Sequence, residues 1–205
     1  MPEFNGVKIH SVQDTKNFWQ NSSMFELEDS MYMERAIWLN DLYRVRFLWN
    51  NVSVEDYSSK SVLDVGCGNG LLAKVVPLAM NYLGIDINES FVNSAENEVV
   101  WKSFKFKVQD VYDLLESDDK YSYVAVTHFF GLFPREEIFS LLPKLWDKCT
   151  DGLYLTVLHN ESNPMEEEFN TYSIDEITNL LSFNDISNKL ISVNSNEIVC
   201  YVWKE

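Results

Sequence analysis

The feature that most constrains this sequence is a glycine-rich segment, Ser61-Val-Leu-Asp-Val-Gly-Cys-Gly-Asn-Gly70, in which apolar residues lead directly into closely spaced glycines. The segment predicts a buried strand and then a tight turn, because Val and Leu favour strands and glycine tolerates backbone conformations that other residues avoid. A strand-to-helix turn of this kind exposes backbone amides to a ligand. We therefore interpret the segment as a ligand-binding loop, with a purely structural turn as the alternative.

From Ser61 onward, short apolar runs alternate with amphipathic stretches, as in folds whose parallel strands are joined by crossover helices. Strands are expected at 61–64, 82–86, 104–109, 123–127, 153–159, 186–193 and 198–203. Helices are expected at 71–80, 89–98, 111–115, 135–148 and 173–183, the last of which opens with the capping-box pattern Ser173-Ile-Asp-Glu176. The polar segment 194–196 suits a tight turn, so the last strand is expected to be antiparallel to its partner.

The spacing of the glycines separates two classes of cofactor. Sites for dinucleotides usually show G-x-G-x-x-G, whereas Gly66, Gly68 and Gly70 follow the pattern G-x-G-x-G. Asp64 stands two residues before the first glycine. A carboxylate there is poorly suited to a pyrophosphate and well suited to a ligand that carries an ammonium group.

Two further acidic residues end predicted strands. Asp86 is placed to accept hydrogen bonds from both hydroxyls of a ribose, since Asn88 is the better cap for the helix that follows. Asp110 has two readings that the residues leave open: it accepts from the amine of an adenine, or it caps the helix that begins at Val111. Open α/β sheets bind ligands at the carboxyl ends of their strands, where these acids are expected to gather.

Together these motifs resemble the class I S-adenosylmethionine-dependent methyltransferases over residues 61–205. Val62-Leu-Asp-Val-Gly-Cys-Gly-Asn-Gly70 is similar to the glycine motif of that family, Gly84-Ile-Asp-Ile87 to its ribose-binding motif and Gln109-Asp110-Val111 to its adenine-contacting motif. The resemblance implies an α/β three-layer sandwich with a seven-stranded, mostly parallel sheet in the order 3-2-1-4-5-7-6, strand 7 being antiparallel. It also implies S-adenosyl-L-methionine as the cofactor.

The resemblance assigns a part of the cofactor to each motif. The backbone at Gly66, Cys67 and Gly68 would lie against the methionine portion, with Asp64 near its amine. The full set of implied cofactor contacts is Asp64, Gly66, Cys67, Gly68, Asp86, Ile87, Asp110, Val111 and Thr127. Within that set Asp86 would hold the ribose, and Ile87, Asp110 and Val111 would meet the adenine.

Two histidines are candidates for the base that removes a proton from the methyl acceptor. His128 and His159 follow the fourth and fifth predicted strands, and histidine titrates close to neutral pH. In this family, residues after the fourth strand commonly face the reacting methyl group, which favours His128. The alternative for both is a histidine that fixes a loop or is partly exposed.

Residues 1–60 lie outside the resemblance, and we expect a helical amino-terminal segment that precedes the core at 61–205. Apolar residues recur at helical spacing between Asp29 and Trp49. Trp19, Tyr32 and Arg35 are candidates for a lid over the substrate, with Arg35 near the cofactor carboxylate. The alternative is that these three side chains only pack against the core or face solvent.

The formal charge of −16 opposes binding to nucleic acid or to anionic membranes. No Asn-Pro-Pro-Tyr or Asp-Pro-Pro-Tyr motif follows the fourth strand, which also disfavours methylation of nucleic acid. No ligand cluster predicts a metal. Three widely spaced cysteines, Cys67, Cys149 and Cys200, suggest a reducing compartment, so we expect a cytoplasmic protein.

The expected function is transfer of a methyl group to an oxygen or nitrogen of a small-molecule acceptor: a metabolite, a sugar or a natural-product intermediate. A nicotinamide-dependent oxidoreductase is one alternative, because it shares the sheet and the ribose-binding acid. A binding subunit that keeps the methyltransferase fold without catalysis is the other.

Overall fold

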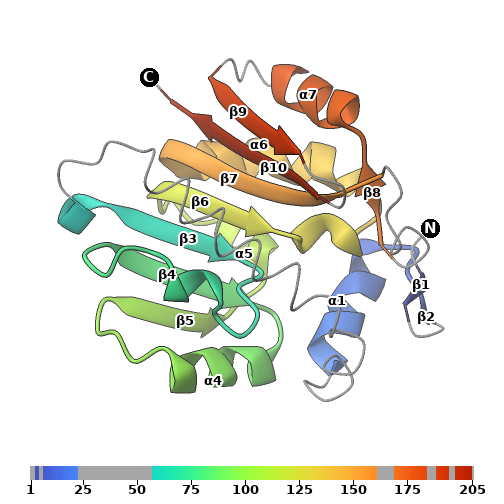
Figure 1. Cartoon of the computed structure of the whole chain (residues 1–205). Coiled ribbons are helices and arrows are strands. Elements are labelled where there is room, and N and C mark those ends of the chain that lie inside the picture. Colours follow the sequence, from blue (N-terminus) through green and yellow to red (C-terminus); the bar gives the residue numbers. More distant parts are fainter. Residues whose placement is uncertain are drawn as a thin grey trace. The chain divides into compact units, whose positions relative to one another are not determined.

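The structure of the protein is a computed structural model. It describes residues 3–4, 7–22, 57–160, 169–183, 188–193 and 197–204. Figure 1 shows the helices and strands along the chain. The chain divides into two compact units. The glycine-loop unit comprises Phe18–Ser117, and the hairpin unit comprises Met1–Asn17 together with Asp118–Glu205.

The glycine-loop unit is built on three parallel strands. These are β3 (Ser61–Val65), β4 (Asn81–Asp86) and β5 (Phe104–Val108), with β4 in the middle. Every residue of β3 after Ser61 is buried, as expected of a parallel strand covered on both faces. Parallel pairing brings the carboxyl ends of all three strands to one edge.

Two helices of this unit match the sequence expectation. They are α4 (Glu89–Glu98), which packs against β4 and β5, and α5 (Val111–Leu115). Asn88 begins α4 because its side chain accepts hydrogen bonds from the amides of Ser90 and Phe91. The cap expected at Asn88 is therefore present.

The prediction of a helix at 71–80 is wrong. After the glycine loop the chain forms only a short 3-10 helix, η2 (Leu72–Lys74), and then turns. Pro77 explains the difference, since its ring disfavours helical geometry at Val76 and it has no amide hydrogen to donate. A ligand at this loop therefore faces the loop's own backbone rather than the start of a regular helix.

The hairpin unit combines parallel and antiparallel pairing. β6 (Tyr121–Thr127) and β7 (Cys149–His159) are parallel and joined through α6 (Glu137–Lys148), which packs against both. β10 (Glu197–Trp203) is antiparallel to β7 and to β9 (Lys189–Val193). The antiparallel last strand is thus confirmed.

Within each unit the strands follow the predicted order, and the mixed α/β fold class is confirmed. One strand of the main sheet was not predicted: β8 (Thr171–Tyr172) pairs in parallel with the end of β7. Its two residues are too few to produce a pattern in the sequence.

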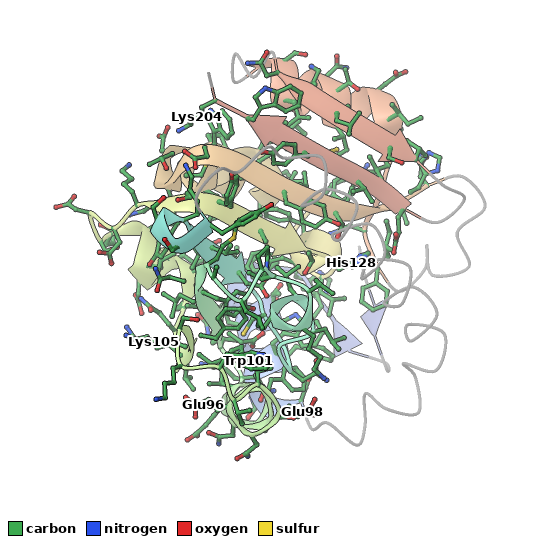
Figure 2. All side chains as sticks on the ribbon, turned by 60° about the vertical axis from the view of Figure 1, so that its left-hand side comes forward. Glu96, Glu98, Trp101, Lys105, His128 and Lys204 are labelled. Atoms are coloured by element: carbon green, nitrogen blue, oxygen red, sulfur yellow. The ribbon has the colours of Figure 1, made fainter. Side chains whose placement is uncertain are left out.

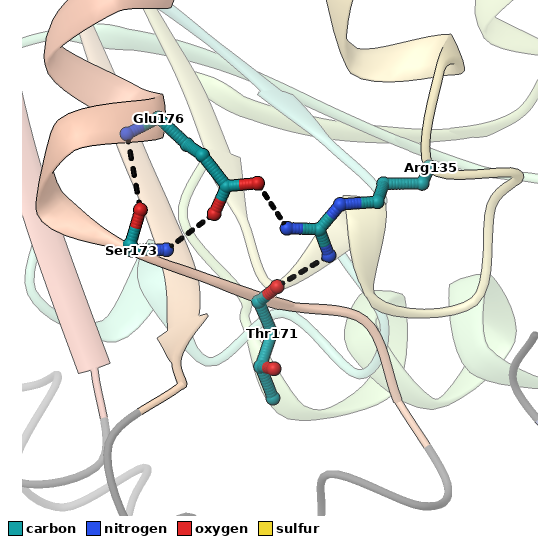
Figure 3. Close-up of polar contacts among 4 residues, drawn as sticks. All are labelled: Arg135, Thr171, Ser173 and Glu176. Atoms are coloured by element: carbon teal, nitrogen blue, oxygen red, sulfur yellow. Dashed lines mark hydrogen bonds and ion pairs between the residues drawn. The ribbon is translucent and has the colours of Figure 1, made fainter.

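Helix α7 (Ile174–Phe183) begins with the predicted capping box (Figure 3). The hydroxyl of Ser173 accepts from the amide of Glu176 at 3.1 Å, and the carboxylate of Glu176 accepts from the amide of Ser173 at 2.7 Å. Arg135 donates to that carboxylate and to the carbonyl of Thr171. The cap therefore also ties the start of α7 to β8.

The described part of the amino-terminal segment contains β1 (Glu3–Phe4), β2 (Val7–Lys8) and α1 (Val12–Asn21). The side chain of Asn88 donates to the carbonyl of Trp19, whose ring lies 6.4 Å from that of Phe91. The helix expected within 29–49, with Tyr32 and Arg35, falls outside the described residues, and the division at residue 60 stays a prediction.

Among the described residues, no helix combines the length and the apolar character needed to cross a membrane.

A short 3-10 helix, η3 (Phe129–Gly131), follows β6, and another, η1 (Tyr57–Ser59), precedes β3.

We expect Ser173→Ala to lower the free energy of unfolding by about 1 kcal/mol, because the amide of Glu176 loses its acceptor. Ser173→Thr keeps the hydroxyl and should retain most of the stability. Urea unfolding followed by circular dichroism measures both variants. An alanine variant as stable as the wild type would show that the cap contributes nothing.

Candidate functional site

The loop that follows β3 is fastened to the end of β4 through its backbone. The amides of Gly66 and Cys67 both donate to the carbonyl of Ile85, at 2.9 and 3.0 Å. The amide of Gly70 turns back to the carbonyl of Cys67 at 2.9 Å. These bonds determine the path of the loop at the carboxyl edge of β3 and β4.

The glycines of this region serve two different purposes. A side chain at Gly70 or Gly84 would collide with neighbours, since an added Cβ would lie 3.0 Å from Ala95 or 2.8 Å from Phe106, respectively. Gly68 has a φ of 52°, and an added Cβ there would meet nothing within 4 Å. Gly70 and Gly84 are therefore required by packing, whereas Gly68 exposes its backbone to open space.

Asp86 joins the glycine loop to the segment that follows β4. Its carboxylate accepts hydrogen bonds from the amide of Gly68 and from the amide of Asn88, each at 2.9 Å. Burial raises the pKa of Asp86, and these hydrogen bonds act in the opposite direction. Since Asn88 caps α4, Asp86 is not used as a helix cap.

Asp64 lies deeper, with an exposed fraction of 1%. One of its oxygens accepts from the hydroxyl of Tyr82 at 2.5 Å, and the other has no hydrogen-bond partner among the described residues. Burial raises the pKa of Asp64 to about 7; the bond from Tyr82 lowers it and the charge of Asp86 raises it further. A buried carboxylate with a spare oxygen is a suitable acceptor for an ammonium group.

The capping alternative for Asp110 is present in the structure. Its carboxylate accepts from the amide of Tyr112 at 3.0 Å and begins α5. The next residue, Val111, is buried, and Ile87 is partly exposed after β4. A contact of Asp110 with adenine stays a prediction, which the cap leaves open because a carboxylate accepts several hydrogen bonds.

In the hairpin unit, His128 follows the last residue of β6, Thr127 (Figure 2). It has a φ of 52°, the left-handed region that residues other than glycine rarely adopt. Its amide donates to Thr156, to the carbonyl at 3.1 Å and to the hydroxyl at 3.0 Å. Such a conformation costs energy and is often found at functional sites.

A carboxylate that the sequence did not single out faces His128. Nε2 of His128 lies 3.3 Å from Oε1 of Glu197, and the exposed fractions of the two side chains are 25% and 2%. Glu197 is the first residue of β10, a strand that is otherwise apolar except at Tyr201. An acidic residue at the start of an apolar run is the one signal that the sequence offered.

His159 ends β7 and is 3% exposed. Its Nδ1 has no hydrogen-bond partner within the part of the chain that the structure describes. Glu197 pairs with Leu158, so His159 points to the opposite face of the sheet from Glu197. The structure thus gives His128 a charged partner that His159 does not share.

Among the described residues, no group of three or more His, Cys, Asp or Glu side chains could hold a metal ion.

The fold is shared with solved methyltransferases. Magnesium protoporphyrin IX methyltransferase from Synechocystis PCC 6803, with bound S-adenosylhomocysteine, superposes with a TM-score of 0.73 at 16% identity, covering 94% of this chain and 99% of that chain. A SAM-dependent methyltransferase from Archaeoglobus fulgidus gives 0.68 at 15% identity, covering 89% and 100%. The plantazolicin methyltransferase BpumL, in complex with a monoazolic desmethylPZN analogue and S-adenosylhomocysteine, gives 0.68 at 14% identity, covering 93% of each chain.

The fold of this chain is thus the Rossmann-like fold of the class I S-adenosylmethionine-dependent methyltransferases. Residues 62–152 match the sequence model of the family described as Methyltransferase domain. The chain is therefore similar to methyltransferases in fold over most of its length and in sequence over residues 62–152, which supports the expected resemblance. A search of curated protein sequences finds no match.

We expect Asp64→Asn to change how stability depends on pH. The folded protein keeps the proton of Asp64 up to about pH 7, whereas the unfolded chain releases it near the ordinary pKa of 3.8. The wild type therefore loses stability as the pH rises through this window, and the asparagine variant has no charge to form. At about 1.4 kcal/mol per pKa unit, the variant should gain roughly 2 kcal/mol relative to the wild type between about pH 5 and 8.

Urea unfolding at several pH values measures this difference. Asp113→Asn, which removes an exposed carboxylate from α5, is the matched control and should follow the wild type at every pH. A constant offset between Asp64→Asn and the wild type would contradict the assignment of a buried, proton-retaining carboxyl group.

Proposed function

We propose that the protein transfers the methyl group of S-adenosyl-L-methionine to an oxygen or nitrogen of a small-molecule acceptor, such as a metabolite, a sugar or a natural-product intermediate. The observation that carries the cofactor assignment is the carboxylate of Asp86 at the end of β4, bonded to the amide of Gly68. The cofactor supplies a methyl group that its positive sulfur already activates. The protein has to align the acceptor, exclude water and take up a proton.

The nucleoside part of the cofactor is assigned to the ends of β4 and β5. Asp86 accepts two backbone hydrogen bonds in the structure, and an ionised carboxylate offers about four acceptor positions. Capacity is left for the two hydroxyls of a ribose. Ile87, Asp110 and Val111, which follow the same strand ends, are assigned to the adenine.

The methionine part is assigned to the glycine loop. The open space over Gly68 allows a ligand to approach the backbone, and Gly66 and Cys67 precede it in the same loop. Asp64 is the proposed partner of the ammonium group, because one of its buried oxygens has no hydrogen-bond partner among the described residues. The donors and acceptors present therefore fit the cofactor.

We assign a small molecule rather than a nucleic acid as the acceptor. The net charge of −16 opposes association with phosphate backbones. Two of the similar structures are enzymes named for magnesium protoporphyrin IX and for plantazolicin, neither of which is a nucleic acid.

For the chemical step we assign His128 as the base and Thr127 as a residue beside the reacting methyl group. A hydroxyl acceptor forms a bond from its oxygen to the methyl carbon while the carbon–sulfur bond breaks and leaves its electron pair on sulfur. The proton of the hydroxyl passes to the imidazole of His128. His159 is the second candidate, and its burial makes it the less accessible of the two.

We further propose that residues 1–60 form a segment that closes over the substrate, with Trp19, Tyr32 and Arg35 among its contacts. The carbonyl of Trp19 accepts from Asn88, two residues beyond Asp86, which supports a place for Trp19 near the ribose. The three cysteines are unpaired and buried, which agrees with a reducing cytoplasm.

We expect S-adenosylhomocysteine to bind the wild type and to bind Asp86→Asn at least about tenfold more weakly, because hydrogen bonds to a charged acceptor contribute about 1.5 kcal/mol or more each. Isothermal titration calorimetry measures both affinities. Asp113→Asn, which removes the same charge from an exposed position on α5, should bind like the wild type. Absence of binding to the wild type, or equal binding to all three proteins, would remove the basis of the proposal.

A further inference from the structure

The buried carboxylate of Glu197 is held in an unusual place in the hairpin unit. β6 and β7 end at Thr127 and His159, while β10 runs in the opposite direction and begins at Glu197. Glu197 pairs with Leu158, one residue before the end of β7. The reversal of β10 therefore brings the carboxylate to the carboxyl edge of two parallel strands.

A carboxylate that is 2% exposed is costly unless a charge or hydrogen bonds compensate it. Nε2 of His128 lies 3.3 Å from Oε1 of Glu197. A protonated imidazole supplies the compensating charge at that distance, so Glu197 favours the form of His128 that has taken up a proton.

The backbone holds His128 from the other side. Its amide donates to both the carbonyl and the hydroxyl of Thr156 on β7, and the left-handed conformation ends the strand there. Among the described residues, the charged and titratable groups at this corner include Glu197 from β10 and, on the other face of β7, His159. With one side anchored by Thr156 and one nitrogen facing Glu197, the ring is held at the strand edge and keeps 25% of its surface exposed.

We infer that Glu197 is a positioning residue that orients His128 and raises its basicity, and that the methyl acceptor is a hydroxyl group. The inference rests on the proposed function, in which His128 takes the proton. A neutral histidine oriented by a carboxylate is the arrangement that removes a proton from a weak acid. An alcohol or phenol needs such a base, whereas a carboxylate acceptor is already ionised and a neutral amine attacks before it loses a proton.

The first test follows His128 directly and needs no acceptor. In protein labelled at the histidine rings, NMR titration should place the midpoint of His128 above the ordinary histidine value of about 6.5. Glu197→Gln keeps the shape and removes the charge, and it should lower that midpoint by about one pH unit. Glu176→Gln is the control, since glutamine also serves in a capping box, and it should leave His128 unchanged.

The outcomes separate this inference from the proposed function. If Glu197→Gln binds S-adenosylhomocysteine like the wild type but leaves the midpoint of His128 in place, Glu197 does not act on His128 and the inference fails alone. If the wild type does not bind S-adenosylhomocysteine, the proposed function fails. Should Glu197→Gln not fold, a wild-type midpoint at or below 6.5 is enough to overturn the inference.

The second test identifies the acceptor class. The protein is incubated with S-adenosylmethionine carrying a carbon-13 methyl group and with a small-molecule extract of cells, and the carbon shift distinguishes methyl ethers from methyl esters and N-methyl groups. We expect a labelled methyl ether, formed at least tenfold more slowly by Glu197→Gln. If the carbon-13 label appears in N-methyl groups or methyl esters, the hydroxyl assignment is overturned. The same holds if no labelled methyl ether is found.

Discussion

One carboxylate at the end of a central strand organises the candidate cofactor site. Asp86 bonds to the amide of Gly68 in the loop after β3 and to the amide of Asn88, which begins α4. The neighbouring carbonyl of Ile85 binds the amides of Gly66 and Cys67. The end of β4 therefore determines both the path of the glycine loop and the start of the next helix, and the contacts assigned to the loop backbone and to the ribose depend on it.

The hairpin unit obtains its charged pair from strand direction. The parallel strands β6 and β7 bring their last residues to the carboxyl edge. His159 ends β7 there, and His128 directly follows β6. An antiparallel strand brings its first residue there instead, and in β10 that residue is Glu197. The imidazole of His128 lies 3.3 Å from this buried acid. The antiparallel direction of β10 thus places a carboxylate beside a histidine.

Local patterns of apolar spacing and helix caps predicted most helices and strands. They failed where a proline or a distant contact decided the structure. The predicted bounds of α4 and α5 match the structure, because each helix has an Asn or Asp cap and an apolar face. The helix at 71–80 was wrong, because two β-branched residues and Pro77 outweigh its apolar spacing. For Asp110 the sequence left two roles open, and the structure shows the helix cap. Glu197 was missed, since nothing near it in the chain points to His128.

The sequence by itself determined the α/β fold class, the resemblance to methyltransferases and the positions of the glycine loop and the strand-end acids. These features are local: they depend on the order of apolar residues, glycines and caps along a few turns of chain. Tertiary structure alone decided which groups meet, including Tyr82 with Asp64 and Glu197 with His128. The physical reason is that burial sets the cost of a charge, and burial depends on which distant strands pack together, so the protonation of Asp64 and the pairing of Glu197 follow only from the folded chain.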